Sequence, residues 1–168
     1  MFERYLFPPE KKDYIMKKRK GLLDKECILC KIAQKNKDFD QLEILRSQFN
    51  IVTVNLFPYN PGHIMIFPIR HLVSFEEMTK EEYLDLQFMT NLSLKILRKI
   101  YNPGGFNIGY NIGKAGGASI SHIHQHIVPR YEHELGFVDI FSGSKIIIET
   151  PWQIYERLVD EFKEEFKK

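Results

Sequence analysis

Residues Ser121 to Pro129 read SHIHQHIVP, and this stretch decides the fold. Its histidines, His122, His124 and His126, stand at every second position. Side chains at i, i+2 and i+4 of a strand point to one face, so a strand over 121–129 would align three imidazoles. A core strand would carry apolar side chains there, and an exposed strand rarely carries three histidines. The row of histidines therefore indicates a functional site, used either for metal ligation or for catalysis by an imidazole nucleophile.

The segment before the histidines is rich in glycine. Gly113 to Gly117 reads GKAGG, and Ser119 follows it. Bare backbone amides and a hydroxyl can hold an anion, although the GxxxxGK[ST] pattern of a Walker loop is absent. Beside three histidines, this loop indicates a phosphorylated substrate that meets an imidazole nucleophile.

The rest of the chain predicts helices and antiparallel strands. Thr79 with Glu82 forms a capping box, from which apolar residues recur at helical spacing to about Tyr101. Further elements are a helix over 27–34, strands over 49–55, 63–68 and 106–112, and a C-terminal helix over 152–166. Because the strands come in antiparallel pairs around one long helix, the fold class is α+β, with an antiparallel sheet of about five strands.

Length and composition exclude several classes of protein. The chain has 168 residues, a net charge of +2, 43% hydrophobic and 27% charged residues, which is typical of one folded domain. We expect an N-terminal arm over 1–25, the main domain over 26–135, and a C-terminal extension over 136–168 that belongs to the same domain. The low charge argues against a nucleic-acid partner, and no apolar run predicts a membrane partner. Two cysteines cannot form a disulfide framework, so we expect a cytoplasmic protein.

The stretch from His122 to Val128 resembles the motif of the histidine triad (HIT) family, in which three histidines alternate with apolar residues. Residues 111–119, Pro129-Arg130 and the pair of Asn55 with 61–63 also resemble the family's pattern. The resemblance covers roughly residues 27–131 and implies a HIT-like fold. Gln125 departs from the apolar rule. The resulting His-Gln-His sequence is similar to that of the bacterial branch that includes diadenosine tetraphosphate phosphorylases.

The resemblance implies a role for each matching residue. His124 would attack the α-phosphorus of a nucleotide and carry the nucleotidyl group, with no cofactor needed for the chemistry. The carbonyl of His122 would orient it, His126 would bond the α-phosphate or the bridging oxygen, and His63 would support the triad. Substrate contacts are implied for Asn55 at the ribose, for Asn111 and Ser119 at phosphate oxygens, and for Gly117 and Gln125.

Cys27 and Cys30 form a CxxC motif, which by itself is compatible with zinc, redox chemistry or two inert thiols. Some HIT relatives with this motif complete a zinc site with two histidines. The matching positions here are His71 and His122. Such a Cys2His2 set would be a closed, structural zinc site.

These residues predict a nucleotide hydrolase or nucleotidyltransferase that cleaves dinucleoside polyphosphates, such as diadenosine tetraphosphate, through a covalent nucleotidyl-histidine on His124. One alternative is a nucleoside phosphoramidase, and another is a nucleotide-binding regulatory module whose turnover is incidental. A protein that uses the triad only as metal ligands is a third. The expected partner is a small nucleotide, and the resemblance also implies a homodimer.

Overall fold

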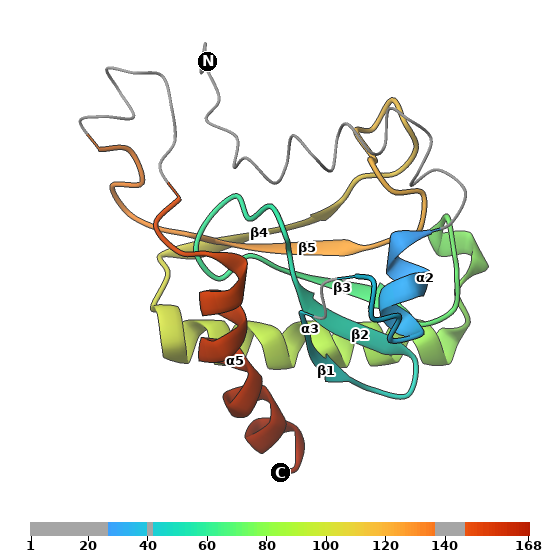
Figure 1. Cartoon of the computed structure of the whole chain (residues 1–168), viewed down its shortest axis with the longest axis horizontal. Coiled ribbons are helices and arrows are strands. Elements are labelled where there is room, and N and C mark those ends of the chain that lie inside the picture. Colours follow the sequence, from blue (N-terminus) through green and yellow to red (C-terminus); the bar gives the residue numbers. More distant parts are fainter. Residues whose placement is uncertain (1–26, 40–41, 137–146) are drawn as a thin grey trace.

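The fold was described from a computed structural model, which places residues 27–39, 42–136 and 147–168 (Figure 1). The helices are α2 (Ile28–Ala33), α3 (Lys80–Tyr101) and α5 (Pro151–Phe166), with a short 3-10 helix, η1, over Phe75–Glu77. The strands are β1 (Glu43–Arg46), β2 (Asn50–Val54), β3 (Ile64–Pro68), β4 (Gly105–Tyr110) and β5 (Gln125–Arg130). The arm predicted over 1–25 and part of the C-terminal extension, 137–146, lie outside the described residues.

The strands form one sheet in the order β1-β2-β3-β5-β4, and every neighbouring pair is antiparallel. The α+β class and the five-stranded antiparallel sheet are therefore confirmed. The predicted hairpin is β2 with β3, in which Asn50 pairs with Pro68 and Val54 with Ile64. β1 is the strand that was not among those predicted.

Helices pack against both faces of the sheet (Figure 1). Alternation along β2 sends Val52 into the larger core, which α3 and α5 share, and sends Ile51 the other way. There Ile51 and Phe67 pack with Leu29 of α2 in a smaller cluster. The face that carries α2 also carries His126, because this residue pairs with Met65 on β3 and alternates with the buried Ile127.

The N-terminus of α3 has the predicted capping box. Glu82 donates its backbone N–H to Thr79 Oγ1, and its carboxylate accepts the backbone N–H of Thr79 at 2.8 Å. The same carboxylate accepts two hydrogen bonds from the guanidinium of Arg70, at 3.0 and 2.9 Å. Arg70 follows β3, so this pair ties the end of β3 to the first turn of α3.

We expect Glu82→Ala to destabilise the protein by about 2 kcal/mol, because it removes a cap and leaves Arg70 without its carboxylate. Glu82 is buried, whereas Glu81 in the same turn is exposed and makes a matched control as Glu81→Ala. Urea unfolding followed by circular dichroism measures both. Equal stability of the two variants would show that the capping box does not anchor α3.

Two predicted strands differ from the structure by more than one residue at an end. The strand expected over 121–129 begins only at Gln125, and residues 119–122 form bends. The pairing with β3 reaches no further than Gln125 with Ile66, so His122 and His124 precede β5. The strand expected over 106–112 is β4, which ends at Tyr110. Within the described ranges, no helix is long and apolar enough to cross a membrane.

Candidate active site and metal site

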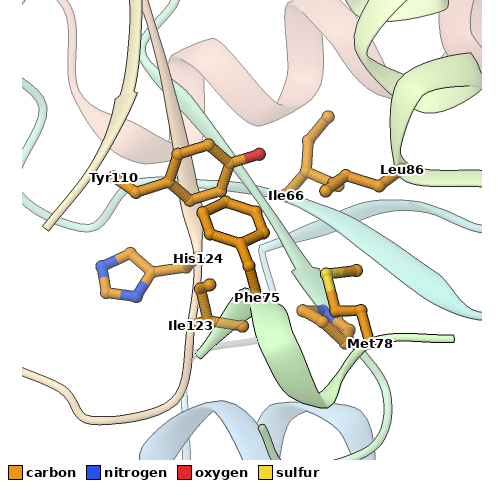
Figure 2. Close-up of a pocket in the computed structure, with 8 residues that line it drawn as sticks. Ile66, Phe75, Met78, Leu86, Tyr110, Ile123 and His124 are labelled. Atoms are coloured by element: carbon orange, nitrogen blue, oxygen red, sulfur yellow. The ribbon is translucent and has the colours of Figure 1, made fainter. Parts of the chain in front are cut away.

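The imidazole of His124 is held by the backbone before it. Its Nδ1 lies 2.8 Å from the carbonyl oxygen of His122. A carbonyl only accepts, so Nδ1 carries the proton and Nε2 carries the lone pair. The side chain is 4% exposed. In Figure 2, Ile123 lies among apolar side chains, and the His124 ring points away from Leu86 and Met78. The side chains of Ile123 and His124 therefore point to opposite sides of the backbone.

A second chain of hydrogen bonds fixes the proton of His126. The backbone N–H of Tyr59 donates to Nδ1 of His63 at 3.0 Å, so the proton of the neutral His63 is on Nε2. That nitrogen lies 3.0 Å from Nδ1 of His126 and donates to it. The remaining nitrogen of His126, Nε2, therefore carries a proton. The site pairs a nucleophilic nitrogen on His124 with a proton donor on His126, whose ring centroids are 4.9 Å apart.

Burial keeps these imidazoles neutral at pH 7. It lowers the pKa of His63 to about 3, with the neighbouring His126 and His124 adding to the effect. Burial, and then His124, lowers the pKa of His126 to about 4. Burial also lowers the pKa of His124, partly opposed by its bond to the carbonyl of His122. Neutral rings are what the second hydrogen-bond chain requires, because Nδ1 of His63 and Nδ1 of His126 both accept hydrogen bonds in it.

The structure places the predicted substrate-binding residues in three different settings. Asn55 is buried, accepts the backbone N–H of Phe57 and has its Nδ2 3.3 Å from His63 Nε2. Asn111 is half-buried and lines a cleft together with His126. Gly117 and Ser119 are exposed in the loop before the histidines. The backbone N–H of Gly117 donates to the carbonyl of Lys114, so it is hydrogen-bonded within the turn of the loop.

Gln125 faces α3, on the opposite side of the sheet from His126. Its Oε1 accepts from Thr90 Oγ1 and its Nε2 donates to Tyr110 Oη, each at 2.7 Å. Tyr110 in turn packs edge-on against Phe75, with ring centroids 4.4 Å apart (Figure 2). Because both polar ends of the Gln125 side chain are hydrogen-bonded to other side chains, this residue links β5 to α3 and β4 on the face opposite His126. A substrate contact, which the sequence predicted, would have to break these bonds.

The four predicted zinc ligands come together beside the triad. The ligand atoms of Cys27, Cys30, His71 and His122 all lie within 4.8 Å of one another. Cys30 Sγ is 3.2 Å from His71 Nδ1 and 3.6 Å from His122 Nδ1, and Cys27 Sγ is 3.4 Å from the latter. Ligands of tetrahedral zinc are about 3.3 to 3.8 Å apart, from its bond lengths. The donor set and its spacing therefore fit a Zn²⁺ ion.

Sequence reasoning missed two contributors to the site. The first is the backbone amide of Tyr59, which sets the tautomer of His63; nothing in the letters LFPYNPGH marks it. The second is Gly109, which pairs with His126 across β4 and β5. A glycine inside an alternating strand is a signal of close backbone approach, and it was available in FNIGYNI.

Comparisons with known proteins place these features in a family. The family model described as HIT domain matches residues 37–133. A Mycobacterium tuberculosis protein named AP-4-A phosphorylase is 37% identical over 111 residues, 66% of this chain and 57% of that protein. A bis(5'-adenosyl)-triphosphatase of Dictyostelium discoideum is 31% identical over 84 residues, 50% of this chain and 56% of that one. This chain thus spans less than two thirds of the length of either relative.

A solved structure shows the same fold. It is the zinc-bound histidine triad family protein of Mycobacterium smegmatis, which is 22% identical and superposes with a TM-score of 0.67 over 84% of this chain and 96% of that one. The family model covers more than half of the 168 residues, including His63, His122, His124 and His126. The chain therefore belongs to the HIT domain family.

Proposed function

We propose that the protein is a nucleotide hydrolase or nucleotidyltransferase that cleaves dinucleoside polyphosphates at the α-phosphorus. The observation that supports this best is the hydrogen bond from His124 Nδ1 to the carbonyl of His122, which leaves a lone pair on Nε2. The names of the relatives, an AP-4-A phosphorylase and a bis(5'-adenosyl)-triphosphatase, point to the same substrate class.

The first half-reaction transfers the nucleotidyl group to His124. Nε2 attacks the α-phosphorus, a P–N bond forms, and the bond from phosphorus to the bridging oxygen breaks with its electrons going to that oxygen. The polyphosphate departs as an anion, and His126 Nε2–H is placed to donate a hydrogen bond that stabilises the charge on the departing oxygen, while His63 Nε2–H remains hydrogen-bonded to His126 Nδ1. His124 is positively charged in the intermediate, which makes the P–N bond easy to break.

In the second half-reaction an acceptor oxygen attacks the phosphorus and the P–N bond breaks, returning the electron pair to His124 Nε2. The acceptor releases one proton to solvent, and His126 Nε2–H again donates a hydrogen bond to the oxygens around the phosphorus. Water as acceptor releases a nucleoside monophosphate, and inorganic phosphate releases a nucleoside diphosphate. Both acceptors are compatible with the site, and none of these steps uses a metal ion.

Product analysis with diadenosine tetraphosphate tests the proposal. We expect ATP and AMP from a hydrolase, or ATP and ADP in the presence of inorganic phosphate from a phosphorylase, resolved by ion-exchange chromatography. Turnover should need no magnesium, because the chemistry is supplied by imidazoles. Cleavage of adenosine 5′-phosphoramidate without cleavage of the dinucleotide would instead identify a phosphoramidase, and tight binding without turnover a regulatory module.

We also propose a structural zinc ion on Cys27, Cys30, His71 and His122. Burial and the neighbouring Cys27 raise the pKa of the Cys30 thiol to about 11, so its thiolate needs a cation beside it. Zinc on His122 Nδ1 would leave the carbonyl of the same residue to hold His124. The ion would thus fix the segment that carries the nucleophile, a positioning role. The homodimer and the cytoplasmic location stay predictions.

A further inference from the structure

A cleft of about 370 Å³ opens beside His126. Its floor is formed by β4 and β5, through Asn107, Gly109 and Val128, and Tyr59 forms a wall from the loop between β2 and β3. Its volume is within the range of small-molecule sites, about 300 to 1,000 Å³. None of the four predicted zinc ligands lines it.

The cation that lines the cleft is held in an ion pair. Arg130 lines the cleft, but its Nε and Nη2 donate to the carboxylate of Glu134, at 2.7 and 2.9 Å, and its Nη1 donates to Asn107 Oδ1. A site for a polyphosphate would present cations free to bind it. These walls instead combine amide groups, aromatic rings and aliphatic side chains, which suit an uncharged planar base and a sugar.

Tyr59 supplies a surface for a base. Its ring is stacked over the imidazole of His126, with centroids 6.0 Å apart and an interplanar angle of 28°, and its side chain remains 53% exposed. Asn107 accepts from Arg130 through Oδ1, which leaves its Nδ2 group as a donor to a base edge or a sugar hydroxyl. Aromatic faces that stack a base, beside amides that bond its edge, are the usual parts of a nucleoside site.

Gly109 keeps this cleft open. It pairs directly with His126, and residues paired across antiparallel strands have Cβ positions on the same face, about 4.5 to 5.5 Å apart. A Cβ at Gly109 would meet no heavy atom within 4 Å, and its φ is not positive. Neither backbone conformation nor packing among the described residues therefore requires glycine here. What a side chain would do is fill the space next to His126 Nε2.

We propose that this cleft is the subsite for the leaving half of the substrate, the second nucleoside of a dinucleoside polyphosphate. The inference rests on the proposed function, because it takes His126 as the donor to the departing oxygen. The leaving group starts at that oxygen, so the chain of phosphates passes His126 and the second nucleoside lies between Tyr59 and β4. The subsite makes the protein selective for substrates with a nucleoside at both ends.

The test fills the cleft without deleting any contact. We expect Gly109→Leu to lower kcat/KM for diadenosine tetraphosphate by at least about tenfold, with a smaller loss for Gly109→Ala. Cleavage of adenosine 5′-phosphoramidate, whose leaving group is ammonia and has no second nucleoside, should fall by a factor at least about fivefold smaller. Gly105→Leu is the matched control, since Gly105 lies on the same strand, has open space at its Cβ and does not line the cleft. It should leave both rates unchanged.

Binding separates failure of this inference from failure of the proposed function. A methylene-bridged analogue of diadenosine tetraphosphate should bind the wild-type protein at least about tenfold more tightly than AMP in calorimetry, and Gly109→Leu should remove that difference. Light scattering and thermal unfolding check that the variants keep their assembly and fold. Wild-type protein that does not cleave diadenosine tetraphosphate refutes the proposed function. Equal affinity for analogue and AMP, or equal losses for both ligands or both substrates in folded Gly109→Leu, overturns the subsite.

Discussion

Replacing His124 by asparagine is expected to lower kcat for diadenosine tetraphosphate by at least about 10⁴-fold, because no other group replaces a covalent nucleophile. The lone pair on His124 Nε2 is available because Nδ1 donates to the carbonyl of His122. An asparagine amide has no comparable lone pair on nitrogen, so neither half-reaction can proceed. Steady-state release of ATP measures the loss.

Two further variants make this result specific. His133→Asn is the matched control, because His133 is exposed and has a φ of 58°, a conformation that asparagine tolerates. It should retain full activity. His126→Ala removes the hydrogen-bond donor to the departing oxygen and should cost less, about 10²- to 10³-fold. That loss should shrink for a substrate whose departing oxygen is less basic.

The covalent intermediate gives a readout that is independent of rate. Wild-type protein mixed with α-³²P-labelled nucleotide and quenched in alkali should retain label on His124, since phosphoramidate bonds survive base. His126→Ala keeps the nucleophile and should therefore still become labelled, although more slowly. Label that persists at the wild-type level in His124→Asn would contradict the assignment of the nucleophile.

Local signals in the sequence were enough for the long elements. Thr79 and Glu82 are three residues apart and cap each other whatever surrounds them, so the start of α3 could be read from the letters alone. β1 has four residues, EILR, and its pairing with β2 slips between Glu43 and Leu45. A strand this short and irregular is defined by its neighbour, which a local pattern does not record.

The start of β5 shows why a correct motif still gave a wrong boundary. Alternation in SHIHQHIVP predicts one strand from 121. The imidazole of His122 instead lies against the two cysteines, and the residue does not pair with β3. Its neighbour Ile123 instead donates its backbone N–H to Leu72 at 2.7 Å. A contact between residues 95 positions apart in the chain decides this geometry. The grouping of the four ligands was implied by family resemblance, whereas the tautomers had to come from the structure.

Loss of the zinc ligand His71 is the second change with a large expected effect. His71 is exposed, so His71→Asn removes little packing, yet it takes one of four donors from the metal group. If zinc is bound, we expect the variant to purify with less than one zinc per chain and to unfold about 10 °C lower than the wild-type protein. Mass spectrometry of metal content and differential scanning calorimetry measure the two effects.

The comparison with metal-free protein isolates the role of the ion. With a chelator present, His71→Asn and wild type should unfold at similar temperatures, because an exposed side chain without a metal contributes little. His133→Asn should behave as wild type in both conditions. Wild-type protein that purifies without zinc, and whose unfolding temperature neither zinc nor chelator changes, would contradict the structural zinc.

Activity should follow zinc as well, because the segment that the ion fixes through His122 also supplies the carbonyl that holds His124. Zinc loss should therefore lower kcat in the same variant while the protein remains folded, which separates positioning of the nucleophile from stability alone.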